Sequence, residues 1–265
     1  MAARIVSLAV GWLGVSVVSV AIAASEPDEA GVFDPPLSRV SLPLTDPPPD
    51  RGAELTCYRY QGFSLKVVES ASTSGDVSIA VAPDPAPGTA APCERAAAPG
   101  ESSMPGPGFD ATGQENDQAG YAFAGIKGRF LVMNLVDAQG ASKFRVYDLT
   151  TLRLRFADGT DMNGPAFIAD EAGTLRLHYR RGINAACSVP EQGQACWDQL
   201  ARDWGFPPDI AATAAPVADC EGAYRAESAP RDDPSIVYYE VEMVVPPDET
   251  ARVAATGKVT CEPMP

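Results

Sequence analysis

The sequence contains a single histidine, His178, among its 265 residues. One histidine cannot supply a metal site built from several imidazoles. A serine or cysteine hydrolase with a histidine base would have to be centred on it, yet no Gly-x-Ser-x-Gly turn is present to carry the nucleophile. We therefore identify no catalytic residue from the sequence.

Metal-binding and redox motifs are also missing. No two of the six cysteines form a Cys-x-x-Cys pair, which argues against zinc and against a thioredoxin-like redox site. Residues 158–164 are rich in side-chain oxygens, but Gly159 occupies the position where a calcium loop needs its first carboxylate. A turn between two strands uses the same residue types, so we predict a turn here, no metal and no cofactor.

Basic residues are scarce. The chain has 20 lysines and arginines against 35 aspartates and glutamates, a formal net charge of −15 at pH 7. Phosphate backbones bind through clustered positive charge, so nucleic acid is not an expected partner.

The chain begins with the pattern of an export leader. Arg4 precedes an apolar run over residues 5–22, and Ala21 and Ala23 form a small-residue cleavage pattern. The alternative, an uncleaved anchor, needs about 20 uninterrupted apolar residues. We predict that residues 1–23 are a signal peptide, that no stable membrane span remains after cleavage, and that the protein is periplasmic or secreted.

All six cysteines follow the leader, so they are expected to form disulfides in an oxidising compartment. Six cysteines allow 15 pairings. Loop geometry favours bonds between sequence neighbours, with the first bond flanking a hairpin and the second holding a helix. The preferred bonds are Cys57–Cys93, Cys187–Cys196 and, by elimination, Cys220–Cys261.

Proline and glycine divide the chain, with 25 and 23 copies respectively. Residues 24–53 are proline-rich and are predicted to be an extended tether without paired strands. Residues 54–265 are predicted to be one disulfide-stapled β domain. Within it, residues 82–120 read as a long loop, and position 120 is a candidate sub-boundary.

Apolar residues alternate in several segments, which is typical of strands with one buried face. The predicted strands are residues 63–67, 77–81, 130–136, 144–147, 152–156, 175–179, 237–245 and 251–261. One short helix is predicted from the spacing of Trp197, Leu200, Ala201 and Trp204, with Gly205 ending it. The expected fold is therefore mainly β, with antiparallel meander or sandwich-like sheets and one short α-helix.

Positive charge is concentrated in one part of this acidic chain. Nine basic and six acidic residues lie from Lys127 to Arg181. If two of the predicted strands are neighbours, alternation places five cationic or ionisable side chains on one surface: Arg153, Arg155, Arg176, His178 and Arg180. Guanidinium groups bind carboxylates and phosphates well, so this surface is a candidate site for an anionic partner. The alternative is pairing with the protein's own acids, such as Glu240 and Glu242.

These patterns favour an exported, non-enzymatic binding or interaction module with an unidentified envelope or extracellular partner. A hydrolase that cleaves an envelope polymer with two carboxylates is an alternative. Sequence spacing cannot select such a pair, because the two groups must lie about 5 to 9.5 Å apart in space. A third hypothesis is a secreted enzyme inhibitor, in which residues 88–110 would form a disulfide-braced loop that projects from the sheet.

Overall fold

The computed structural model describes residues 32–44, 53–69, 77–83, 92–94, 96–104, 121–135, 141–161, 165–169, 174–246 and 252–264. The chain divides into two compact units, Met1–Ala30 and Gly31–Pro265, and the second contains all of the described residues. The predicted leader lies outside these ranges.

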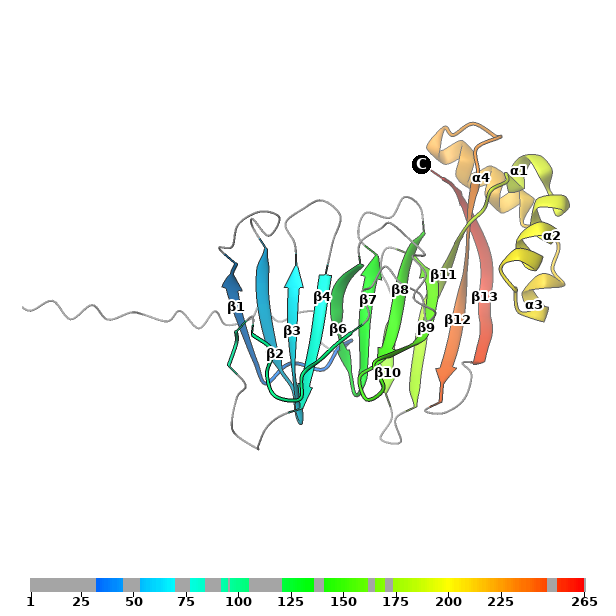
Figure 1. Cartoon of the computed structure of the whole chain (residues 1–265). Helices are drawn as coiled ribbons and strands as arrows, with labels where there is room; N and C mark the ends of the chain where they lie inside the picture. The colour runs from blue at the N-terminus through cyan, green and yellow to red at the C-terminus, as the bar shows by residue number, and fades with distance from the viewer. Residues whose placement is uncertain are drawn as a thin grey trace, which may run out of the picture. The chain divides into compact units, whose positions relative to one another are not determined.

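The described part of the chain is mainly β, as the sequence predicts, and forms three antiparallel sheets. Strands that are neighbours in the sequence are also neighbours in each sheet. The first sheet contains β1 Ser38–Pro43, β2 Glu54–Arg59, β3 Phe63–Glu69, β4 Val77–Pro83 and β5 Ser102–Ser103. The second contains β6 Tyr121–Lys127, β7 Phe130–Leu135, β8 Ser142–Asp148 and β9 Arg153–Thr160. The third contains β10 Ala166–Ala169, β11 Leu175–Asn184, β12 Ser235–Val245 and β13 Arg252–Pro263. Figure 1 shows the sheets in chain order.

The second sheet is buried on both faces. On β7, Phe130 and Val132 belong to a core shared with the third sheet, whereas Leu131 and Met133 belong to a core shared with the first sheet. Successive residues of a strand point to opposite faces, so one continuous apolar run serves two cores. Two hydrophobic cores therefore connect the three sheets.

Four helices lie between β11 and β12: α1 Val189–Gln192, α2 Gln194–Asp203, α3 Pro208–Ala211 and α4 Val217–Glu227. They pack against the third sheet (Figure 1), and their buried residues join the core that this sheet shares with the second sheet. α2 is the predicted helix. Trp197 and Leu200 are buried as expected, but Trp204 is 39% exposed, because it caps the helix instead of facing the core. The other three helices were not predicted.

The described part of the proline-rich stretch 24–53 includes a paired strand, which the predicted tether excluded. β1 lies within it and pairs with β2 in antiparallel register, with Val40 opposite Cys57. Just before β1, the Asp34 amide donates a hydrogen bond to the Ile126 carbonyl of β6 at 2.8 Å. The prolines allow this because Pro43 is the last residue of an edge strand, where a missing N–H group is tolerated.

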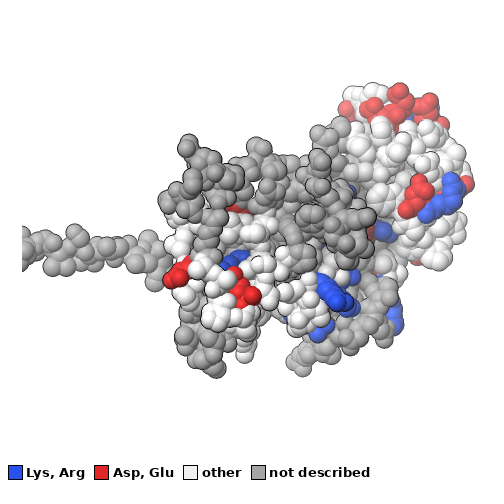
Figure 2. All heavy atoms as spheres, viewed as in Figure 1, with Lys and Arg blue, Asp and Glu red and all other residues white. Residues whose placement is uncertain are grey.

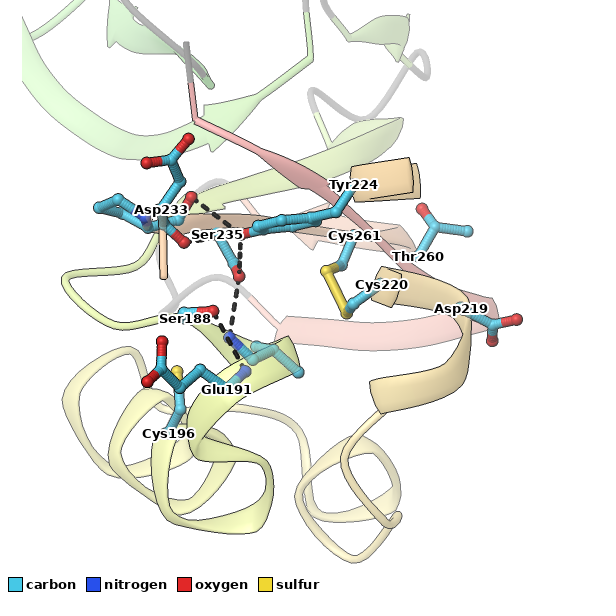
Figure 3. The surroundings of a disulfide bond; sticks show 12 residues. Ser188, Glu191, Cys196, Asp219, Cys220, Tyr224, Asp233, Ser235, Thr260 and Cys261 are labelled. Atoms are coloured by element: carbon cyan, nitrogen blue, oxygen red, sulfur yellow. Dashed lines mark hydrogen bonds between the residues drawn. A yellow bond between two sulfur atoms is a disulfide. The ribbon is translucent and has the colours of Figure 1, made fainter. Parts of the chain in front are cut away.

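The six cysteines form the three bonds that the sequence favours: Cys57–Cys93, Cys187–Cys196 and Cys220–Cys261. Figure 3 shows the third bond, between α4 and β13. Near it, the Tyr224 hydroxyl donates a hydrogen bond to the Asp233 carbonyl at 2.8 Å, and the Val189 amide donates one to Ser235 Oγ at 2.9 Å. These contacts hold the helices on the end of β12.

Candidate functional site

The structure divides the predicted cationic surface between two sheets. Arg153 and Arg155 lie on β9 in the second sheet, whereas Arg176, His178 and Arg180 lie on β11 in the third. The end of β9 lies beside β11, where the Asp161 amide after β9 donates a hydrogen bond to the Arg180 carbonyl at 3.1 Å. The five side chains are therefore not brought together by strand pairing within a single sheet.

A β-bulge in β9 also changes the predicted alternation. Val146 pairs with Phe156 and Tyr147 pairs with Leu154, which leaves Arg155 as the extra residue. As a result, Leu154 packs against the core of the first sheet and Phe156 against the core of the third. The prediction that these two residues share one face is wrong, because an inserted residue reverses the pattern of a strand.

The alternation on β11 holds. Leu175, Leu177 and Tyr179 are at most 2% exposed and lie in the core. Arg176 and His178 are exposed on the opposite face of the same strand. An exposed row of ionisable side chains is thus attached to a rigid, buried strand.

Three of the five predicted residues have partners within the protein. Arg180 donates hydrogen bonds to Thr260 at 2.7 Å and Glu262 at 3.3 Å, and its guanidinium lies 4.1 Å from the centre of the Tyr238 ring. His178 Nε2 lies 3.8 Å from a carboxylate oxygen of Glu240, one of the acids proposed as an internal partner. Elsewhere, Arg155 donates a hydrogen bond to the Pro246 carbonyl at 2.9 Å.

Arg153 and Arg176 differ from these three. Both side chains are exposed, and within the described ranges neither forms an ion pair or a side-chain hydrogen bond. They are the members of the predicted set whose guanidinium groups face solvent.

Sequence reasoning missed a buried polar cluster between the second and third sheets, which we call the inter-sheet cluster: Asp158, Tyr179, Arg181 and Tyr239. Asp158 accepts hydrogen bonds from Tyr179 at 2.5 Å and from Arg181 at 2.9 Å. Arg181 also donates one to the Tyr239 hydroxyl at 2.8 Å. The sequence predicts a turn at Asp158, but this residue lies in β9 opposite Phe144. Its position in a bulged strand is not visible in the local sequence.

Burial and charge shift the pKa values of this cluster. Burial raises the pKa of Tyr179, and the adjacent Asp158 carboxylate raises it further. Burial by itself would lower the pKa of Arg181, but Asp158 and Tyr239, through their charges and hydrogen bonds, together outweigh burial and leave that pKa raised. The side chains of Asp158 and Arg181 are 6% and 14% exposed. The ion pair between Asp158 and Arg181 therefore links the second and third sheets.

Within the described ranges, no group of three or more histidine, cysteine, aspartate or glutamate side chains is arranged to hold a metal ion. The helices of this part of the chain are also too short or too polar to span a bilayer. Comparison of the chain with known protein families, with curated proteins and with solved structures finds no match.

Proposed function

We propose that this chain is an exported binding module and that the exposed row of β11 contributes its contact surface for an anionic partner. The observation that carries the proposal is the two-sided character of β11. Leu175 and Leu177 fix the strand in the core, and Arg176 projects from its other face into solvent. A cationic side chain on a rigid strand loses little backbone freedom when it binds.

The distribution of charge supports an anionic partner. Figure 2 shows lysine and arginine side chains over the region of β8 to β12 in this view, whereas over the helices and the first sheet acidic side chains lie beside basic ones. Arg153 on β9 provides a second exposed guanidinium in the positively biased segment. Guanidinium groups form paired hydrogen bonds with phosphate or carboxylate oxygens.

The leader pattern and the disulfides support export. Three disulfides involve all six cysteines, and such bonds persist in oxidising compartments outside the cytosol. An exported protein meets anionic polymers of the envelope or the extracellular space, which suits the proposed chemistry.

Polymer binding by single variants tests the proposal. Fluorescent polyphosphate and polyglutamate are titrated separately with the wild type, Arg176→Gln, Arg153→Gln and a control, Arg225→Gln. Arg225 lies on α4, and its side chain is 74% exposed. We expect Arg176→Gln to weaken binding of one polymer severalfold and the control to leave it unchanged. Equal affinity of all variants, or equal loss in the control, would overturn the proposal.

The two polymers distinguish the two anionic chemistries. Preference for polyphosphate indicates a phosphate-bearing partner, and preference for polyglutamate indicates a carboxylate-bearing one. Arg153→Gln tests whether β9 belongs to the surface. A severalfold loss with this variant extends the surface to the second sheet, whereas an unchanged affinity limits it to β11.

A further inference from the structure

A short segment crosses the outer face of the first sheet and ends in β5, the edge strand that pairs with β4. We call residues 92–94 and 96–104 the flap. The face beneath it carries Cys57, Lys66 and Ala80, which are aligned in register across β2, β3 and β4. The opposite face of these strands forms the core shared with the second sheet. The flap therefore lies against the sheet, and its described part does not project as an inhibitor loop would.

The flap is attached by one covalent bond, by one lysine and, at its end, by the pairing of β5 with β4. Cys93 is bonded to Cys57. Lys66 Nζ donates a hydrogen bond to the Ala96 carbonyl at 2.6 Å and lies 2.8 Å from a carboxylate oxygen of Glu101. At the end of the flap, the Met104 amide donates a hydrogen bond to Ile79 at 2.9 Å.

Apolar burial contributes little to this attachment. Most flap residues are exposed, and only Cys93, Ala98, Glu101 and Met104 are half-buried. Segments with few buried apolar contacts open at low free energy once their strongest attachment is removed. The disulfide is thus the cross-link that attaches residues 92–94 and 96–101, which precede the β5 pairing, to the sheet.

The three disulfides differ in accessibility. Cys57 and Cys93 are both half-buried. By contrast, Cys187 and Cys196 are 7% and 1% exposed, and Cys220 and Cys261 are 0% and 3% exposed. Thiol–disulfide exchange requires a thiolate to reach a sulfur atom along the S–S axis, so an exposed bond reacts first.

We propose that Cys57–Cys93 is a reductant-sensitive latch that holds the flap over Lys66. A dithiol reductant is the co-reactant. Its thiolate attacks one sulfur of the Cys57–Cys93 bond and forms a mixed disulfide, and the other cysteine leaves as a thiolate. The second thiol of the reductant then closes to a cyclic disulfide and releases the remaining cysteine. The protein gains two electrons and two protons, and the reductant is oxidised.

Release of the flap changes the surroundings of Lys66. Both of its partners in the described chain, the Ala96 carbonyl and Glu101, belong to the flap. A small hollow next to it is lined in part by Cys57, Ser64 and Pro92, and the Ser64 hydroxyl is buried there without a hydrogen-bond partner. Opening therefore exposes an amine and a hydroxyl on the first sheet. This inference does not depend on the proposed anionic partner.

Amine labelling with graded reduction tests the latch. The full chain is treated with increasing concentrations of dithiothreitol and acylated with an N-hydroxysuccinimide ester, and the modified lysines and free cysteines are mapped by mass spectrometry. We expect Cys57 and Cys93 to become free before the other four cysteines. Lys66 labelling should rise at least tenfold over the same range, while labelling of Lys258, which is 73% exposed, stays constant.

Two variants separate the latch from its ion pair. Cys57→Ser with Cys93→Ser should label at Lys66 without any reductant. Glu101→Gln, which keeps the disulfide, should remain largely protected until reductant is added. The proposal is overturned if Lys66 labels equally before and after Cys57–Cys93 is reduced, or if another disulfide is reduced first. If the double serine variant fails to fold, the dithiothreitol series on the wild type still tests whether reduction of Cys57–Cys93 exposes Lys66.

Discussion

The first sheet with its flap and the third sheet with its helices are both fastened by disulfides, but in different surroundings. In the first sheet, the bond Cys57–Cys93 is half-buried and holds a mostly exposed segment. In the third sheet, Cys196 and Cys220 lie on helices and are at most 1% exposed within the core. The same covalent link therefore works as a surface latch in one region and as part of the core in the other.

Chain entropy alone does not distinguish the two regions. The bonds Cys57–Cys93 and Cys220–Cys261 join residues 36 and 41 positions apart. A loop of either length gives about 4 kcal/mol of stabilisation in the unfolded-chain estimate. Any difference between the two bonds must therefore come from the folded state, where only the second is fully packed.

The largest expected effect comes from removing this packed bond. Cys220→Ala with Cys261→Ala should lower the free energy of unfolding by about 4 kcal/mol from chain entropy, and further through lost packing of buried sulfur atoms. Cys57→Ala with Cys93→Ala should lower the free energy of unfolding by less, because Cys57 and Cys93 are only half-buried and their sulfur atoms have fewer packing neighbours. Urea unfolding of both double variants measures the difference. Equal losses would mean that packing around the sulfur atoms adds nothing.

A pair of tryptophans tests burial within the third region. Trp197 is fully buried, and its ring centre lies 4.9 Å from that of Phe206. Trp197→Ala should destabilise the protein by about 3–5 kcal/mol, because it leaves a large cavity. Trp204 follows the same helix and is 39% exposed, so Trp204→Ala should change stability by less than about 1 kcal/mol. Similar losses of stability in the two variants would contradict the conclusion that α2 packs on the core through Trp197 and not through Trp204.

The inter-sheet cluster tests whether a buried ion pair contributes more to stability than an exposed one. Asp158→Asn leaves the charge of Arg181 buried without its partner, which should destabilise by about 3 kcal/mol. The matched control is Asp219→Asn, because Asp219 pairs with Lys258 on the surface and both side chains are largely exposed. Asp219→Asn should lower the free energy of unfolding by less than about 1 kcal/mol. Thermal unfolding of the two variants measures the ratio, and a ratio near one would argue against a role in joining the sheets.

The positions of most strands could be predicted from the sequence, because apolar residues at every second position are the ones that face the core. On β3 and β4, the pairs Leu65–Val81 and Val67–Ile79 are the residues that the alternating pattern places on one face. The same holds for the buried face of β12. Two of the disulfides also follow from the loops that they close, since Cys57–Cys93 flanks a hairpin and Cys187–Cys196 attaches a nearby helix, and Cys220–Cys261 then follows by elimination.

Other features depend on information that a local pattern does not contain. The extra residue at Arg155 reverses the side of every later residue in β9, and one residue is too small a signal to detect. β1 is exposed along its whole length, and its short alternation at Val40 and Leu42 lies in a proline-rich stretch that favours an extended tether over a paired strand. α4 does have a local helical pattern: the buried Cys220 and Tyr224 are four residues apart, which is the spacing of one helix face.

The smallest expected effect is a loosening of the flap in acid. Burial raises the pKa of Glu101, but the Ala98 amide and Lys66 outweigh burial and hold the pKa below its ordinary value. A depressed pKa means that this carboxylate stabilises the closed flap above the unfolded value of about 4.3. The stabilisation is lost as the pH falls through the lower pKa of the folded state. Hydrogen exchange of the Met104 amide, normalised to its intrinsic rate, should therefore speed up between pH 5 and pH 3.

An amide of the other region provides the comparison. The Ser235 amide donates a hydrogen bond to the Cys187 carbonyl at 3.0 Å, next to the buried disulfides. Its normalised exchange should stay constant over the same pH range, because no carboxylate attaches that contact. Glu101→Gln should show the same Met104 exchange rate at both pH values, moderately faster than the wild type at pH 5, because the variant has no carboxylate to protonate and keeps the disulfide. If Met104 in the wild type is equally protected at pH 5 and pH 3, the ion pair does not hold the flap, and the disulfide acts alone.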